Sequence, residues 1–304
     1  MSFWHRLGRD LKDNRAYYIM FIPIIIYFII FCYLPMGGII IAFQNFRPAL
    51  GILGSKFVGL KNFMDFFRSV YFGRVLRNTV ALSLLSLFIC FPLPIVFALL
   101  LNEIHNLRFK KTIQTISYMP YFISLVVLAG IIIDFTSSDG LIGGTLMRVF
   151  AGREVNLLSD PKYFRSIMIV SELWQGLGYS SIIYVAALSS VDQEQYEAAE
   201  IDGANRWQQT FHITLPGISS TIIIMLILKC GTLLAVGSEK IILLYNANTY
   251  ETADVISTFV YRKGLQEFNY GYSTAVGLFN SVINFVLILS TNALANRFSD
   301  SSLF

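Results

Sequence analysis

The stretch YYIMFIPIIIYFIIFCYLPMGGIIIAF, residues 17–43, contains no charged side chain and is almost entirely apolar. A bilayer core about 30 Å thick needs roughly 20 apolar residues in a helix, because lipid offers no partner for backbone N–H and C=O groups. The whole chain has the same character, with 55% hydrophobic residues, 14% charged residues and a mean hydropathy of +0.61. This composition excludes an ordinary soluble domain. We therefore expect an all-α membrane protein.

Six stretches are long and apolar enough to cross a bilayer: 17–43, 78–101, 113–135, 166–190, 217–237 and 274–295. They predict a six-helix transmembrane domain over residues 17–295, flanked by a cytoplasmic N-terminal segment (1–16) and a cytoplasmic tail (296–304). The first apolar run is too long for a signal peptide and lacks a cleavage site, so we expect it to stay in the mature protein. The first three stretches contain five prolines that predict kinks or packing bends, namely Pro23, Pro35, Pro92, Pro94 and Pro120.

The number and the density of basic residues in the loops predict opposite orientations in the membrane. The side that holds both termini carries nine Lys and Arg residues, whereas the opposite side carries thirteen. The basic residues near the first helix and in the short loop 102–112 are dense, and such segments have more orienting weight than long loops. We therefore expect both termini in the cytoplasm. The opposite, outer segments carry scattered bases, among them Arg148, Arg153, Lys162 and Arg165 in one loop and Lys240, Arg262 and Lys263 in another.

A polar stretch, EQYEAAEIDGANRWQQTFHITLP at 194–216, interrupts this apolar chain. Residues 193–202 are good helix formers, and Gly203 provides the positive φ that ends a helix in a turn. Asn205 can cap a second helix, in which Trp207 and Phe211 share one face. Pro216 is typical of the start of the next membrane helix. The pattern predicts either a helical lever anchored at both ends to membrane spans, or an ordinary amphipathic loop on the membrane surface.

The sequence contains few groups that could carry chemistry. It has no phosphate-binding loop, no nucleophile elbow, no metal-binding cluster of His and Cys, and no concentrated basic face for nucleic acid. Glu172 and Lys229 are ionisable residues inside predicted spans, and Gln175 lies one helical turn from Glu172. Either these three residues line a polar substrate pathway, or Glu172 and Lys229 form a structural ion pair or snorkel toward the membrane surface.

The stretch at 194–216 resembles the signature of permease subunits of binding-protein-dependent ABC importers, E-A-A-x3-G-x9-I-x-L-P. Every defined position is matched, by Glu197, Ala198, Ala199, Gly203, Ile213, Leu215 and Pro216. Three further segments resemble the carbohydrate branch of this family, including maltose- and alginate-type permeases: RFKKTIQTISYMPYFIS (108–124), WQGLGYSSIIYVAALSSVD (174–192) and LLYNANTYETADVISTFVYRKGL (243–265).

The resemblance implies a type I, MetI-like permease fold in the bacterial cytoplasmic membrane, with residues 191–216 as the loop that couples it to a cytoplasmic ATPase. It implies a transport subunit and not an enzyme, with ATP and Mg²⁺ held by two ATPase subunits and no cofactor or metal on this chain. The other expected partners are a second homologous permease, which is either a different chain or a copy, and an extracytoplasmic solute-binding protein. The expected substrate is an oligosaccharide or polysaccharide, with an acidic glycan such as alginate as one case.

Two other classes of protein stay open as alternatives. A secondary transporter or channel would need neither the loop motif nor an ATPase, and would be expected to show internal repeats or more ionisable groups within the membrane. A membrane-embedded enzyme acting on lipid-linked sugars would need clustered acids or histidines near the interface. Nothing in the residues identifies the sugar.

Overall fold

The computed structural model describes residues 13–298, and the chain divides into two compact units. The first unit contains the residues up to Phe67 together with Arg262–Leu278, and the second contains Arg68–Tyr261 together with the residues from Phe279 onward. The predicted N-terminal segment and tail therefore lie largely outside the described residues. In the labels below, η marks a short 3-10 or π-helical segment.

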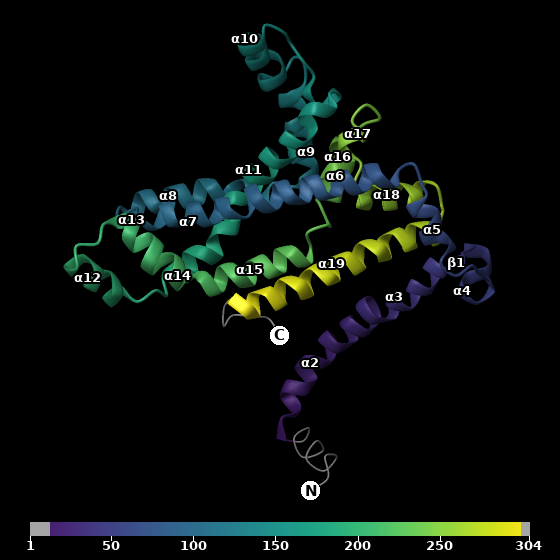
Figure 1. The fold of residues 1–304 in the computed structure, drawn as a ribbon, viewed down its shortest axis with the longest axis horizontal. Helices are drawn as coiled ribbons and strands as arrows, with labels where there is room; N and C mark the ends of the chain where they lie inside the picture. Colours follow the sequence, from purple (N-terminus) through teal and green to yellow (C-terminus); the bar gives the residue numbers. More distant parts are fainter. Residues whose placement is uncertain (1–12, 299–304) are drawn as a thin grey trace. The chain divides into compact units, whose positions relative to one another are not determined.

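The first unit is built mainly from helices and one small β-ribbon (Figure 1). Strands β1 and β2 pair antiparallel, with Gln44 opposite Phe57 and Asn45 opposite Lys56. Phe43 stacks on Phe57 beside this ribbon. The elements are α2 (Arg15–Tyr27), η1 (Phe28–Tyr33), α3 (Leu34–Met36), η2 (Gly37–Phe43), β1 (Gln44–Asn45), η3 (Pro48–Leu50), α4 (Gly51–Gly54), β2 (Lys56–Phe57), α5 (Lys61–Phe67), η9 (Arg262–Gln266) and the first residues of α19 (Tyr270–Phe298).

In the described residues of the second unit every regular element is helical, and α11 is its centre because it packs against α7, α8, α15 and α17. Near the end of α15, the Leu234 N–H donates to Asn284 Oδ1 of α19 at 3.1 Å. The elements are α6 (Phe72–Leu85), η4 (Ser86–Cys90), α7 (Pro92–Asn102), α8 (Leu107–Tyr118), η5 (Met119–Phe122), α9 (Leu125–Thr136), η6 (Leu141–Leu146), α10 (Met147–Ala151), η7 (Leu157–Ser159), α11 (Pro161–Leu188), α12 (Gln193–Ile201), α13 (Arg206–Gln209), η8 (Thr210–Thr214), α14 (Leu215–Gly217), α15 (Ser219–Gly231), α16 (Ser238–Leu244), α17 (Tyr250–Ala253), α18 (Ile256–Tyr261) and the rest of α19.

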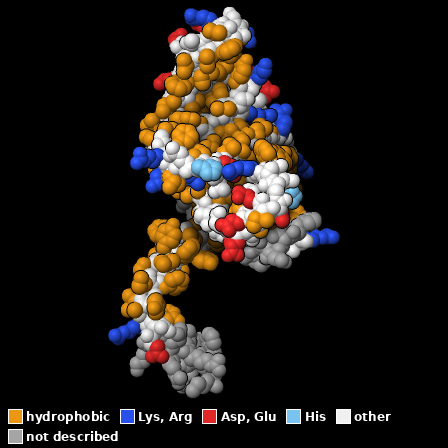
Figure 2. All heavy atoms as spheres, turned by 90° about the vertical axis from the view of Figure 1, so that its left-hand side faces the viewer, with side chains coloured by type: hydrophobic (Ala, Val, Ile, Leu, Met, Phe, Trp, Pro, Cys, Tyr) orange, Lys and Arg blue, Asp and Glu red, His pale blue; other side chains and the backbone are white. Residues whose placement is uncertain are grey.

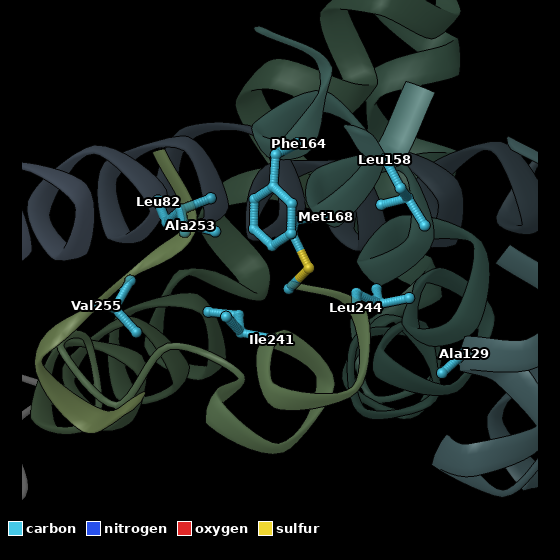
Figure 3. Packing of buried hydrophobic residues seen from close by; sticks show 9 residues of the cluster. All are labelled: Leu82, Ala129, Leu158, Phe164, Met168, Ile241, Leu244, Ala253 and Val255. Carbon is cyan, nitrogen blue, oxygen red and sulfur yellow. The ribbon is translucent and has the colours of Figure 1, made fainter. Parts of the chain in front are cut away.

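One apolar cluster packs around the first turns of α11 in the second unit. Phe164 and Met168 of α11 lie at its middle, with Ile241 and Leu244 of α16 packed against them (Figure 3). Leu82 from α6 and Ala129 from α9 complete contacts from two further helices. The short helix α16 is therefore folded back into the bundle and is not a free outer loop.

The helical membrane fold predicted from the sequence is confirmed. Four stretches among residues 13–298 are long and apolar enough to span a membrane: Arg15–Phe43, Phe72–Asn102, Leu125–Ala151 and Tyr270–Arg297. A fifth is the pair Arg206–Gly217 and Ser219–Gly231, bent by 60°. The remaining predicted span, 166–190, corresponds to α11 (Pro161–Leu188), which has 28 residues and is long enough to cross.

The third predicted span was wrong in its bounds. Residues 113–135 do not form one helix, because α8 ends at Tyr118 and the backbone is extended at Ile123 and Ser124. Ser124 caps the next helix by accepting a hydrogen bond from the Val127 N–H at 3.4 Å. Pro120 lies in the 3-10 turn between the two helices. The missing proline N–H and the serine cap together explain why an apolar run becomes two helices.

Wide π-helical segments lie near prolines of the first two spans, where the sequence predicts kinks or packing bends. Segment η1 follows Pro23 and precedes Pro35, and η4 ends just before Pro92. Segment η8 likewise precedes Pro216. A proline clashes with the carbonyl one turn before it, and a wider turn is one way to relieve that clash.

Candidate functional site: the 191–216 loop and the charged cavities

The first helix of the polar loop, α12, ends in the turn that its glycine predicts. Gly203 has a φ of 80°, a conformation that costs other residues about 1–2 kcal/mol. Its N–H bonds to the Glu200 carbonyl at 3.1 Å, and the Ala204 N–H bonds to the Ala199 carbonyl at 2.9 Å. This pair of bonds is a Schellman motif, which satisfies the last carbonyls of α12 and reverses the chain. The predicted turn at Gly203 is confirmed.

The second helix, α13, begins with a reciprocal cap. Asn205 Oδ1 accepts from the Gln208 N–H at 2.9 Å, and Gln208 Oε1 accepts from the Asn205 N–H at 2.8 Å. Trp207 and Phe211 stack with ring centroids 6.3 Å apart, and their side chains are 74% and 59% exposed. The loop therefore presents an aromatic pair to its surroundings from a helix whose start is fixed.

The end of the loop is rooted in the core of the second unit. Ile213 and Leu215 pack against a buried cluster that contains Tyr184, Leu188 and Ile218. This packing gives the apolar positions of the I-x-L-P pattern a structural reason. Pro216 lies in the last turn before the 60° bend, and the next helix begins at Ser219. The expectation that Pro216 itself starts the membrane helix was therefore wrong by one short turn.

Other side chains tie the loop to the bundle. Tyr196 of α12 and Thr214 of η8 share a hydrogen bond of 2.9 Å between their hydroxyl oxygens. Arg206 Nη1 donates to Glu103 Oε2, just beyond the end of α7, at 2.9 Å. Helix α12 is thus joined to η8, and α13 is joined to the residue that follows α7.

The exposed side of the loop has a definite surface. Glu197 and Ala198 are exposed and Ala199 is half-buried, and Figure 2 shows acidic side chains gathered on the face that carries α12. A hollow of about 290 Å³ lies between the two helices, with Ala199, Gly203 and His212 among its lining residues. Small side chains at 198 and 199 leave room for another protein to approach the backbone.

A second group of polar residues lies inside the bundle. Lys229 Nζ lies 3.4 Å from Glu172 Oε1, and the Ser86 hydroxyl donates to the same oxygen at 2.7 Å. Two cavities, of about 310 Å³ and about 270 Å³, share Glu172, Lys229 and Thr232 in their walls. The pair therefore forms an ion pair and also lines a cavity. Gln175 does not belong to the walls of these two cavities.

The sequence analysis missed Lys240. It was grouped with the bases of the outer loops, but the structure buries it to 7% exposure and turns it toward Ser171, with Nζ 3.5 Å from the hydroxyl oxygen. Lys240 lines the second cavity together with Glu172 and Lys229. The available signal was the sequence KIILL directly after a break in an apolar run, because a lysine beside four apolar residues is unusual in an exposed loop.

The chain is similar to known transport proteins over nearly its whole length. A family model described as "Binding-protein-dependent transport system inner membrane component" matches residues 66–300. The polygalacturonan/rhamnogalacturonan transport system permease protein YteP of Bacillus subtilis (strain 168) is 43% identical over 299 residues, which cover 98% of this chain and 93% of the relative. Protein LplB of the same organism is 43% identical over 295 residues, covering 97% and 92%.

A solved structure has the same fold as this chain. One chain in the crystal structure of a bacterial alginate ABC transporter, in complex with an alginate pentasaccharide-bound periplasmic protein, is 42% identical and superposes with a TM-score of 0.90. The match covers 98% of this chain and 100% of that chain.

Proposed function

The chain belongs to the family of binding-protein-dependent transport system inner membrane components, and from this premise we propose that it forms half of the translocation pathway of an ATP-driven importer for an acidic oligosaccharide or polysaccharide. The observation that carries the proposal is the loop 191–216, which is capped at both helices, rooted in the core and exposed where a partner could dock. If the loop lost its caps and its packing against the core, the permease could no longer be coupled to the ATPase.

The mechanism divides the work between chains. Two cytoplasmic ATPase subunits bind ATP and Mg²⁺ and close on each other, and each carries a docked permease loop with it. Because α12 and α13 are tied to α7 and to the Ile218 cluster, a displacement of the loop is transmitted to the membrane helices. A second homologous permease completes the pathway, and an extracytoplasmic solute-binding protein delivers the sugar. The seven residues of the motif, Glu197, Ala198, Ala199, Gly203, Ile213, Leu215 and Pro216, belong to this coupling region, with Glu197 as a polar contact to the ATPase.

The proposed substrate class follows from similarity and charge together. One relative is named as a transporter of polygalacturonan or rhamnogalacturonan, and the alginate transporter imports an acidic polysaccharide. The cavities described above contain two lysines and one glutamate, a balance that suits an anionic sugar better than a neutral one.

The proposed location is the bacterial cytoplasmic membrane, with several spans and both termini in the cytoplasm. This orientation puts the loop 191–216 on the same side as ATP. Residues 17–295 then form the transmembrane domain, with lipid around its outer surface and no role for nucleic acid.

Co-purification and ATPase measurements test the proposal. The tagged chain should retain a second permease and an ATPase subunit, and the ATPase activity of the complex in vesicles should rise when its sugar-loaded binding protein is added. Sugar uptake that proceeds without ATP would instead indicate a secondary transporter or channel. Chemical conversion of a lipid-linked sugar by the purified chain alone would indicate a membrane enzyme.

A further inference from the structure

Lys240 is a buried ammonium group with no carboxylate beside it. Among residues 13–298 no Asp or Glu oxygen lies within 4.0 Å of its Nζ, and its one hydrogen-bond partner is the Ser171 hydroxyl at 3.5 Å. That hydroxyl donates to the Met168 carbonyl at 2.9 Å, so it faces Lys240 as an acceptor. Burying a charged group without a counter-charge is costly, and an ionisable residue inside a membrane domain therefore points to a functional site.

Glu172 does not neutralise both Lys229 and Lys240. Its Oε1 atom already accepts a hydrogen bond from the Ser86 hydroxyl and pairs with Lys229. Two ammonium groups therefore share one carboxylate around the walls of one cavity, which leaves an excess of one positive charge.

Part of the cavity wall is irregular backbone, which could not face lipid because its N–H and C=O groups are not paired within a helix. Between α15 and α16 the residues 232–237 are irregular, and most of them, including Thr232 and Gly237, line the second cavity. Irregular backbone at membrane depth is tolerated only where it is buried in protein or lines a cavity, and broken helices form substrate sites in other transporters. The two cavities meet at Glu172, Lys229 and Thr232, and each is near the lower end of the volumes that hold small ligands.

The position of Lys240 is fixed by its neighbours. The next residue, Ile241, is fully buried in the cluster with Phe164 and Met168, and Leu244 packs on the same side one turn later (Figure 3). The ammonium group is thus preorganised, and a ligand that uses it does not have to order a flexible loop.

We propose that Lys240, together with Lys229, binds the carboxylate of an acidic sugar unit in this cavity and makes the pathway selective for anionic glycans. This inference rests on the proposed import function for its ligand, but its electrostatic part can be tested without transport. The carboxylate would accept hydrogen bonds from Lys240 and compete with Glu172 for Lys229, and it would neutralise the excess charge. A neutral sugar could accept the same hydrogen bonds but would leave that charge uncompensated.

The first experiment measures the charge of the cavity in the full chain. Thr232→Cys is introduced after the three native cysteines are replaced by alanine, and the rates of modification by anionic and cationic methanethiosulfonate reagents are compared. Lys240→Gln should lower the anionic-to-cationic rate ratio at least about threefold, because it removes a unit charge from the cavity wall. Lys111→Gln, which removes an exposed lysine of α8, should leave the ratio unchanged. An unchanged ratio in Lys240→Gln overturns the inference.

The second experiment measures selectivity in vesicles that contain the complete importer. The probes are alginate pentasaccharide and pentagalacturonate, each beside its carboxyl-reduced form, which keeps the ring and linkage but lacks the charge. Lys240→Gln should reduce uptake of the acidic forms about tenfold, the fold-change expected for one lost charged hydrogen bond, and change uptake of the reduced forms less than about twofold. Lys240→Arg should keep most of the preference.

The outcomes separate the two proposals. Equal loss for acidic and reduced sugars in Lys240→Gln assigns Lys240 a structural role and overturns the inference, although import itself stands. If the wild-type importer takes up none of the four sugars while the cavity keeps its preference for the anionic reagent, the proposed substrate class fails and the anion site stands.

Discussion

At the scale of single residues, Gly203 shows how one backbone angle can matter for coupling. Its φ of 80° suits glycine, and a Cβ built at this position meets no atom within 4 Å, so conformation and not space is what excludes other residues. Asparagine tolerates this region better than other residues, and a β-branched residue tolerates it poorly.

We predict that Gly203→Val allows insertion but uncouples ATPase activity from transport, because strain of about 1–2 kcal/mol or more at the turn alters the path of the loop. Gly203→Asn should retain most of the transport. The measurement is uptake per ATP hydrolysed in vesicles, with Gly73→Val as the control, since Gly73 also has open space around it but lies in a helix with negative φ. Wild-type coupling in Gly203→Val would count against the lever.

Ile218 is the second residue with a measurable role. It is 1% exposed at the bend between the loop and α15, where it packs among Tyr184 and Leu188. We predict that Ile218→Ala costs about 2–5 kcal/mol by leaving a cavity at the root of the loop. The thermal unfolding midpoint of the chain in detergent should fall, whereas Ile183→Ala, at a position 43% exposed, should change it little. Equal midpoints for the two variants would show that the root is not tightly packed.

At the scale of elements, the coupling loop depends on its anchors. Helix α12 has nine residues and α13 has four, lengths at which an isolated helix is unstable in water. The Schellman turn, the capping box and the contacts to Thr214 and Glu103 therefore supply the order that length does not. The proposed coupling role relies on this order, because a loop held at several points would pass movement on to the membrane helices.

The Arg206–Glu103 ion pair should contribute only modestly to that order. Its side chains are 65% and 45% exposed, and exposed pairs are worth about 0.2–1 kcal/mol. We predict that Arg206→Gln lowers ATP-coupled uptake by at most about fivefold, as expected for loss of the pair, and that Arg206→Glu lowers it further, because it adds repulsion with Glu103. Combining it with Glu103→Arg should restore uptake, because the reversed charges can pair again. A double variant as impaired as the single one would mean that Arg206 acts through a partner protein.

At the scale of the whole molecule, the proposed coupling role depends on the orientation of the chain in the membrane. Loop charge alone favours neither side clearly, but the coupling role requires residue 202 in the cytoplasm and residue 153 outside. Both side chains are exposed, so both positions can be labelled.

We predict that a membrane-impermeant maleimide labels Arg153→Cys but not Asp202→Cys when it can reach only the extracytoplasmic face of the cytoplasmic membrane. In inverted vesicles the pattern should reverse. The chain without native cysteines is the control for background labelling. Labelling of Asp202→Cys from outside would contradict the proposed topology and the coupling role together.

The sequence by itself determined the class of this protein and the structure of its loop. Long apolar runs can satisfy their backbone in lipid only as helices, so composition and run length were enough to predict a helical membrane fold. Gly203 and Asn205 act through local backbone angles and caps, which depend on neighbours in the sequence, and both were predicted correctly. Pro120 predicted a kink within one span, but the helix boundary at Ser124 was missed, because the residues on both sides of this cap are apolar.

Tertiary structure decided what lies in the cavities. Glu172, Lys229 and Lys240 come from α11, α15 and α16, and no spacing along the chain shows that they converge. Lys240 is buried only because α16 folds back onto Phe164 and Met168, a contact between residues about 75 positions apart along the chain. Local patterns determine helices and turns through short-range sterics and hydrogen bonds, whereas the charge of a cavity depends on which distant helices pack together.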